Sequence, residues 1–158
     1  MMRPKGLAED DTPMLPVIQH AVRSYEHKHR GIKVDAVMIL QPTSPLRTYE
    51  DIDRCMKIFK TNMCDSLVSV FEGVHHLKSY DQDGNPYLAQ TPYDKRKYKC
   101  YTRNGAIFLL SRNLLDSGKL YSEKPFLYTM PRSKSIDIDH MDDMIMAEAL
   151  LKYGGEGK

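Results

Sequence analysis

An apolar run at residues 34–40 (VDAVMIL) is the feature that most constrains the fold of this chain. Its length and composition suit a buried strand, and a polar, proline-containing segment follows at residues 41–47 (QPTSPLR). Apolar residues at helical spacing precede it over residues 14–25 and follow it over residues 52–59, and a second apolar run lies at residues 66–71. This helix–strand–helix–strand order predicts parallel strands in a doubly wound α/β sheet.

The pattern changes after Glu72. Residues 73–103 are polar, aromatic and basic, and the turn-forming residues 81–86 (DQDGNP) predict a hairpin or arm that leaves the sheet. Further core elements are expected at residues 105–110 and 126–130 (strands) and from Met141 onward (a helix). Thr48 and Ser111 are expected to cap the helices that follow them. We therefore expect a single domain over residues 1–158 with a mostly parallel sheet, a protruding arm, and a flexible tail at residues 154–158.

Composition excludes several classes of function. The net charge of +2 over 158 residues gives no support for nucleic-acid binding. The longest apolar run is far shorter than the ~20 residues of a membrane-spanning helix, and the polar start does not resemble a signal peptide. The cysteines are odd in number and lack metal-ligand spacing, which favours free thiols in the cytoplasm. They are Cys55, Cys64 and Cys100.

The segment at residues 41–47 has the composition of a ligand-binding loop. It follows a predicted strand, where open α/β sheets place ligand groups. Its two prolines restrict the backbone, so that Gln41, Thr43 and Ser44 become fixed hydrogen-bonding groups. Arg47 adds a planar fork suited to carboxylate or phosphate. The alternative is a proline-rich turn that leads into a helix, with Arg47 on the surface.

Two aspartates stand before the last predicted helix, in residues 135–139 (SIDID). In an extended strand, Asp137 and Asp139 point to one face while Ile136 and Ile138 point to the other. Two convergent carboxylates suit Mg²⁺, which is commonly held by one or two carboxylates together with substrate phosphates. The alternative is that Asp139 only caps the following helix.

Three segments in this order resemble the acylneuraminate cytidylyltransferases, also called CMP-sialic acid synthetases. They are residues 41–47, 103–108 (RNGAIF) and 135–139, and the resemblance extends from Leu7 to about Tyr153. It implies a nucleotide-diphospho-sugar transferase-like fold and an enzyme that joins CTP to a nine-carbon 2-keto sugar acid, with Mg²⁺ as cofactor. The products are the CMP-sugar and pyrophosphate. The sugar acid is of sialic, legionaminic or pseudaminic type.

The resemblance also implies roles for individual residues. Asp137 and Asp139 are expected to be catalytic and to hold Mg²⁺, and residues 73–103 are expected to form a homodimer contact. The alternatives for this basic arm are a solvated surface and, because bases alternate with aromatics, single-stranded nucleic acid. The expected substrate-binding residues are Gln41, Thr43, Ser44, Arg47, Arg103, Asn104 and Gly105. For Gly105 the alternative is a bulge or close packing at the start of a strand.

One family feature is not found. Members of the family begin with a strand and a glycine- and lysine-rich loop, of the form Arg-x-Gly-Ser-Lys-Gly, that holds the CTP phosphates. The only early glycine here is Gly6, so we expect the chain to match the C-terminal portion of such an enzyme. A second hypothesis is therefore a catalytically incomplete fragment that serves for dimerisation and sugar binding. A third is a glycosyltransferase that uses the two aspartates as its own metal site.

Overall fold

The computed structural model describes residues 3–73, 79–80, 86–87 and 100–154 of the chain. Most of the expected arm and the expected flexible tail beyond Gly154 lie outside the described residues. Within this part, helices and strands alternate as the sequence predicts, and the α/β class is confirmed. None of the described helices is both long and apolar enough to cross a membrane.

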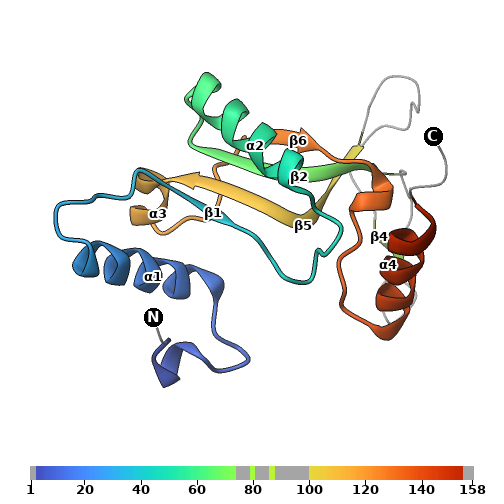
Figure 1. Ribbon diagram of the computed structural model, residues 1–158, viewed down its shortest axis with the longest axis horizontal. Helices are drawn as coiled ribbons and strands as arrows, with labels where there is room; N and C mark the ends of the chain where they lie inside the picture. The colour runs from blue at the N-terminus through green and yellow to red at the C-terminus, as the bar shows by residue number, and fades with distance from the viewer. Residues whose placement is uncertain (1–2, 74–78, 81–85, 88–99, 155–158) are drawn as a thin grey trace.

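Four strands form the main sheet, in the order β1-β5-β2-β6 (Figure 1). Strand β5 pairs antiparallel with both β1 and β2, and β2 pairs parallel with β6. The expected mostly parallel pairing is therefore wrong, although β1, β2 and β6 run in the same direction. The reason is that β5 returns from the end of β2 and inserts between β1 and β2. The strands are β1 (Ala36–Ile39), β2 (Ser66–Gly73), β5 (Cys100–Ser111) and β6 (Phe126–Thr129).

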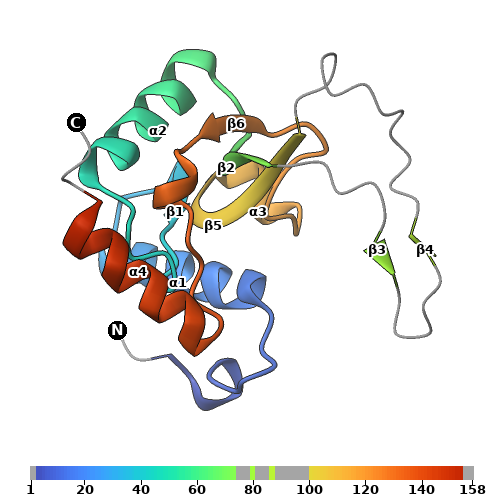
Figure 2. The same cartoon turned by 90° about the vertical axis from the view of Figure 1, so that its right-hand side faces the viewer.

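Helices cover both faces of this sheet, because each has one apolar side to bury. Helix α1 (Met14–Lys28) packs Ile18 and Val22 on one face, against Leu110 of β5 and Leu115. Helix α2 (Tyr49–Asn62) covers the other face, so that the sheet lies between α1 and α2 (Figure 2). The remaining helical elements are η1 (Lys5–Leu7), α3 (Arg112–Asp116), η2 (Arg132–Lys134) and α4 (Met141–Tyr153).

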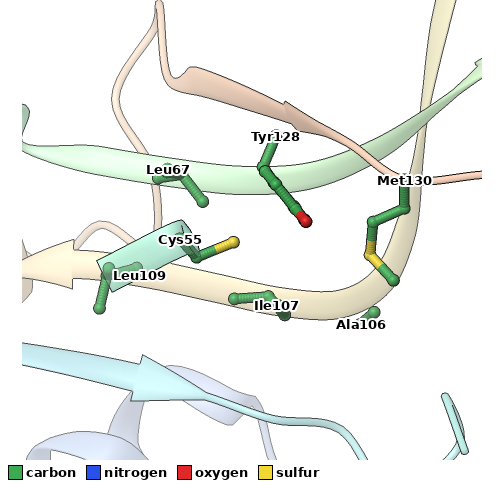
Figure 3. Close-up of a cluster of buried hydrophobic side chains, with 7 residues drawn as sticks. All are labelled: Cys55, Leu67, Ala106, Ile107, Leu109, Tyr128 and Met130. Atoms are coloured by element: carbon green, nitrogen blue, oxygen red, sulfur yellow. The ribbon is translucent and has the colours of Figure 1, made fainter. Parts of the chain in front are cut away.

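The core beneath α2 contains the largest set of buried apolar side chains (Figure 3). Cys55 of α2 is fully buried there, and burial raises the pKa of its thiol to about 12. The expectation of a free, structural thiol is confirmed for Cys55. The cluster comprises Cys55, Leu67, Ala106, Ile107, Leu109, Tyr128 and Met130.

The start of β5 and the segment at residues 135–139 differ from the prediction. Strand β5 begins at Cys100, opposite Gly73, so residues 100–103 belong to the main sheet rather than to the arm. Within the expected arm, β3 (Ser79–Tyr80) pairs antiparallel with β4 (Pro86–Tyr87), as a hairpin around the predicted turn requires.

Residues 135–139 are not a strand, because residues 135–138 pair with no described strand and the chain bends at residues 139–140.

Candidate functional site

The loop that follows β1 is fixed to β5 by Arg47. Its guanidinium Nη1 donates to the carbonyl of Gln41 at 3.1 Å and to the carbonyl of Ala106 at 2.6 Å. Burial lowers the pKa of Arg47, against an opposing effect of the nearby Asp51 carboxylate. These contacts make the side chain an internal anchor of the loop, and the alternative of a surface residue does not describe them. The expected contact of Arg47 with substrate stays a prediction.

Two further contacts join the loop to the other predicted segments. The Ser44 hydroxyl is fully buried and donates to the carbonyl of Asn104 at 3.3 Å. The carbonyl of Thr43 accepts a hydrogen bond from the amide of Ile138 at 2.8 Å. The three segments that are far apart in sequence therefore meet in space, with the loop at residues 41–47 between the other two.

Gly105 lies at the point of closest approach. Its φ of +72° is in the left-handed region, which favours glycine, and a Cβ there would lie 2.7 Å from Asp137 Oδ2 and 2.8 Å from Gln41 Oε1. Gln41, Gly105 and Asp137 thus form one contact group, which we call the corner. The alternative of close packing is confirmed for Gly105, and what packs against it is the side chains of two predicted site residues.

Asn104 organises the interior beside the corner. It is only 3% exposed. Its side-chain oxygen accepts from the Ser69 hydroxyl at 2.6 Å and from the amide of Ala106 at 3.3 Å, and its side-chain nitrogen donates to Ser135 Oγ at 2.9 Å. Because both ends of the amide have partners within the fold, Asn104 orders the strand and the 135–139 segment rather than presenting a free group. The sequence analysis did not identify Ser69 or Ser135. Ser69 could have been noticed, because its hydroxyl stands within an otherwise apolar strand.

Asp137 supplies the carboxylate of the corner. Its Oδ1 atom is buried and has no hydrogen-bond partner among the described residues. A buried carboxylate oxygen without a partner is costly, because the charge has lost water and gained nothing in return. A cation next to Oδ1 would remove this cost, so this residue fits the Mg²⁺ that the resemblance implies.

Asp139 differs from Asp137 in its surroundings. It is exposed, at the bend where the chain enters α4. The N-cap of α4 is His140, and Asp143 completes a capping box, since its carboxylate accepts from the amides of His140 at 2.9 Å and Asp139 at 3.1 Å. These two hydrogen bonds lower the pKa of Asp143. The capping role considered for Asp139 thus falls to His140, and Asp139 offers an exposed carboxylate two residues beyond Asp137.

Arg103 is not brought to the corner. Its guanidinium lies 4.8 Å from the centre of the Tyr121 ring, in a groove that Val68, Val70 and Leu127 also line. Alternation along β2 turns Val68 and Val70 to the face opposite Ser69, which bonds Asn104. The segment at residues 103–108 therefore divides, with Asn104 and Gly105 on the side of the corner and Arg103 on the other.

A second polar group supports the segment that leads to Asp137. Asp51 of α2 is 4% exposed and accepts from Tyr128 Oη at 2.9 Å and from Lys134 Nζ at 3.2 Å. Burial opposes its ionisation, but hydrogen bonds from Thr48, Tyr128 and Lys134 together hold the pKa of Asp51 below its usual value. Burial and the Asp51 contact raise the pKa of Tyr128 to about 12, so its hydroxyl stays a donor.

This network ties α2, β6 and η2 together just before residues 135–139. The amide of Thr48 also donates to Asp51 at 3.0 Å, which completes a capping box at the start of α2. Sequence reasoning identified Thr48 as the cap. It missed Asp51, although the spacing Thr48-x-x-Asp51 was visible.

No cage of protein ligands is found for a metal. Among the residues that the structure describes, no three His, Cys, Asp or Glu side chains gather closely enough to hold one. Mg²⁺ is often bound by one or two carboxylates, with substrate phosphates as the other ligands. Asp137 would be one such carboxylate.

The fold of the chain is similar to that of a solved protein. A solved 4-diphosphocytidyl-2C-methyl-D-erythritol synthase from Anaerococcus prevotii superposes with a TM-score of 0.53 at 17% identity, over 82% of this chain and 64% of that one. At this identity the likeness establishes the fold alone. No family model matches the sequence.

Curated relatives point to a narrower group. A CMP-N,N'-diacetyllegionaminic acid synthase from Legionella pneumophila is 28% identical over 98% of this chain and 69% of the relative. An N-acylneuraminate cytidylyltransferase from Escherichia coli is 26% identical over 93% of this chain, which spans only 36% of that protein. The resemblance to the acylneuraminate cytidylyltransferases is confirmed, and the relatives that the chain resembles are enzymes of cytidylyltransferase type.

Proposed function

We propose that this chain takes part in transfer of a cytidylyl group from CTP to a nine-carbon 2-keto sugar acid. The sugar's anomeric hydroxyl attacks the α-phosphorus of CTP, the bond to the β-phosphate oxygen breaks, and pyrophosphate leaves. Such a reaction depends on positioning and on neutralising charge more than on covalent help from the protein. Relatives that carry the names of CMP-legionaminic acid and CMP-sialic acid enzymes support this substrate class.

The single observation that carries the proposal is the unpartnered oxygen of Asp137 beside Gln41. Asp137 would hold Mg²⁺ through this oxygen, and exposed Asp139 would join it when substrate binds. The bound ion would neutralise phosphate charge and lower the pKa of a coordinated hydroxyl. Gln41 Oε1, which shares the corner with Asp137, would accept a hydrogen bond from a substrate hydroxyl.

The other predicted residues would act by holding these groups in place. Arg47 and Ser44 fix the loop, and Thr43 fixes the 135–139 segment through its carbonyl. Asn104 fixes Ser135, and the absence of a side chain at Gly105 lets Asp137 and Gln41 approach each other. We keep a homodimer, the dimer contact in residues 73–103 and a cytoplasmic location as predictions.

A calorimetric titration with CTP tests the proposal, done with and without Mg²⁺. Wild-type protein should bind CTP only with Mg²⁺, and Asp137→Asn should weaken that binding by at least about tenfold, because one metal ligand is lost. Asp53→Asn is the matched control, since Asp53 is an exposed carboxylate on α2 outside the corner. The affinity of the Asp53→Asn variant for CTP should equal that of the wild-type protein.

The fragment hypothesis predicts a different outcome. A chain that has only the sugar side of the site would bind the sugar acid but not CTP, with or without Mg²⁺. That result would reject cytidylyl transfer by this chain alone. Where CTP does bind, release of pyrophosphate on adding the sugar acid separates nucleotidyl transfer from glycosyl transfer, which would release a nucleoside diphosphate.

A further inference from the structure

The segment that carries Asp137 connects the end of β6 to the start of α4. Strand β6 ends where the amide of Met130 donates to the carbonyl of Val70 at 2.8 Å, and α4 begins after the bend at residues 139–140. Between these points the chain forms η2 and then residues 135–138, which pair with no described strand. The position of this segment therefore depends on individual hydrogen bonds rather than on a sheet ladder.

Two of these hydrogen bonds join the segment to parts of the site already described. Ser135 Oγ accepts from the side-chain nitrogen of Asn104 at 2.9 Å, which fixes the start of residues 135–139 to β5. The amide of Ile138 donates to the carbonyl of Thr43 at 2.8 Å, which fixes the far end to the loop at residues 41–47. Asp137 lies between these two contacts.

Lys134 provides a further contact, to the start of α2. Its Nζ donates to Asp51 Oδ2 and to Thr48 Oγ1, both at 3.2 Å. Thr48 directly follows the loop at residues 41–47, and Lys134 directly precedes residues 135–139. The ion pair therefore lies where two of the three segments of the site leave the rest of the fold.

Asp51 is a fixed partner for this lysine. Its carboxylate also accepts from the amide and the hydroxyl of Thr48, both at 3.0 Å, and from Tyr128 Oη at 2.9 Å. An ion pair between two exposed, mobile side chains contributes little. Here the side chain of Asp51 is 5% exposed and that of Lys134 is 36% exposed, so a buried, fixed carboxylate restrains a more exposed ammonium group.

We propose that Lys134 is a positioning residue for the carboxylate of Asp137. By pairing with Asp51 it holds η2 against the start of α2, and so fixes the direction in which the chain enters residues 135–139. This keeps Asp137 beside Gln41 before any ligand binds. The consequence for binding rests on the proposed function, but the positioning itself is a property of the ligand-free protein.

Hydrogen exchange in the ligand-free protein, followed residue by residue by NMR, tests the positioning. Lys134→Met removes the ammonium group and keeps a long aliphatic side chain. The amide of Ile138 should exchange about tenfold faster in this variant, because the segment opens more often. The amide of Ile107, which donates to Ser69 Oγ at 2.7 Å within the core, should exchange at the wild-type rate.

A double-variant comparison separates the ion pair from other effects of the lysine. Asp51→Asn should also speed exchange at Ile138, and adding Lys134→Met to it should cause little further change, because both substitutions break one contact. Additive effects would show that Lys134 does not act through Asp51. If Asp51→Asn fails to fold, the comparison with Arg132→Met below still decides the question.

CTP titration in the presence of Mg²⁺ tests the consequence. Lys134→Met should weaken binding roughly tenfold, as the loss of a group that orients a metal ligand commonly does. Arg132→Met is the matched control, since it removes a positive charge from an exposed position of the same short helix. It should leave both CTP affinity and the exchange rate of Ile138 at their wild-type values.

The two measurements have separate outcomes. Exchange at Ile138 that stays slow in Lys134→Met, or that Arg132→Met speeds equally, would overturn the positioning role. Faster exchange with unchanged CTP affinity would also overturn it, as would tighter CTP binding, which would mean that the lysine charge competes with Mg²⁺. If wild-type protein binds no CTP, cytidylyl transfer by this chain alone is rejected, while the exchange rates still decide the role of Lys134.

Discussion

The corner and the β1 edge are both incomplete, but in different ways. At the corner, side-chain hydrogen bonds fix the loop, β5 and the 135–139 segment, and a single oxygen of Asp137 is left without a described partner. Along β1, the backbone groups of Ala36 and Met38 face away from β5 and pair with no described strand, and apolar grooves flank them. The polar group left over at the corner is thus a single side-chain atom held in a rigid setting, whereas the groups left over along β1 form a row of backbone atoms.

Gly105→Ala should have the largest effect, because it acts on the tightest contact of the corner. The new Cβ would displace Asp137 or Gln41, and the left-handed backbone would add strain of about 1–3 kcal/mol. We expect a clear fall in the urea midpoint and loss of Mg²⁺-dependent CTP binding.

Gly118→Ala is the control for this change. Gly118 has a similar φ of +80°, but a Cβ there meets nothing within 4 Å. It should therefore show the strain alone, with CTP binding intact. Equal losses of CTP binding in the two variants would show that the contact with Asp137 and Gln41 does not matter.

Asn104→Ala should come next, because it removes the amide that orders the interior of the corner. The Ser69 and Ser135 hydroxyls and the amide of Ala106 would lose a buried partner, at a cost of about 1–3 kcal/mol in the free energy of unfolding. Chemical denaturation measures this. Asn113→Ala, at an exposed position on α3, should change stability by less than about 0.5 kcal/mol.

Asp137→Asn should have a smaller effect on the free energy of unfolding. The sign of this effect should depend on whether Mg²⁺ and CTP are present. Without Mg²⁺, replacing this carboxylate, whose Oδ1 atom is buried and has no described partner, by a neutral amide should raise the free energy of unfolding by up to about 1 kcal/mol. With Mg²⁺ and CTP, wild type should become the more stable protein, because ligand binding stabilises only the form that binds. Thermal unfolding in both conditions checks this, and a variant that stays more stable in both would contradict the metal assignment.

The smallest effect should be a pH dependence from Asp51. Its pKa in the folded protein lies below the usual 3.8, so its hydrogen-bonded carboxylate stabilises the fold above that value. The stabilisation should be lost as pH falls below about 3.8 through the lower folded pKa. The stability difference between wild type and Asp51→Asn should therefore be constant from pH 5 to 7 and shrink in more acidic solution. A difference that grows on acidification would show that the pKa is raised.

Much of the fold followed from local patterns. The apolar periodicity placed α1, α2 and α4, and Thr48 and Ser111 were correctly identified as helix caps. The place of β5 in the sheet could not be predicted, because residues 34–40 and 66–71 have the same pattern whether they neighbour each other or flank a third strand. Which strands pair is decided by contacts between residues that lie far apart in the sequence, and local patterns do not reveal those contacts.

The three segments that carry the resemblance lie together in the structure. A polar residue type does not reveal whether its partner is a substrate or the fold, so the substrate-binding roles expected for these residues stay predictions. Arg47, Ser44 and Asn104 bond to the protein itself. Asp137 and Asp139 were treated as equivalent on the assumption of a strand, but the bend at residues 139–140 leaves one enclosed and the other exposed.

Paramagnetic relaxation by Mn²⁺ in place of Mg²⁺ tests the central claim most directly. With CTP present, substoichiometric Mn²⁺ should broaden the amide NMR signals of Gly105 and Ile138 while that of Gly118 stays sharp, and Asp137→Asn should abolish the selective broadening. Selective broadening that survives Asp137→Asn, or that is centred elsewhere in the chain, would contradict a metal site at the corner.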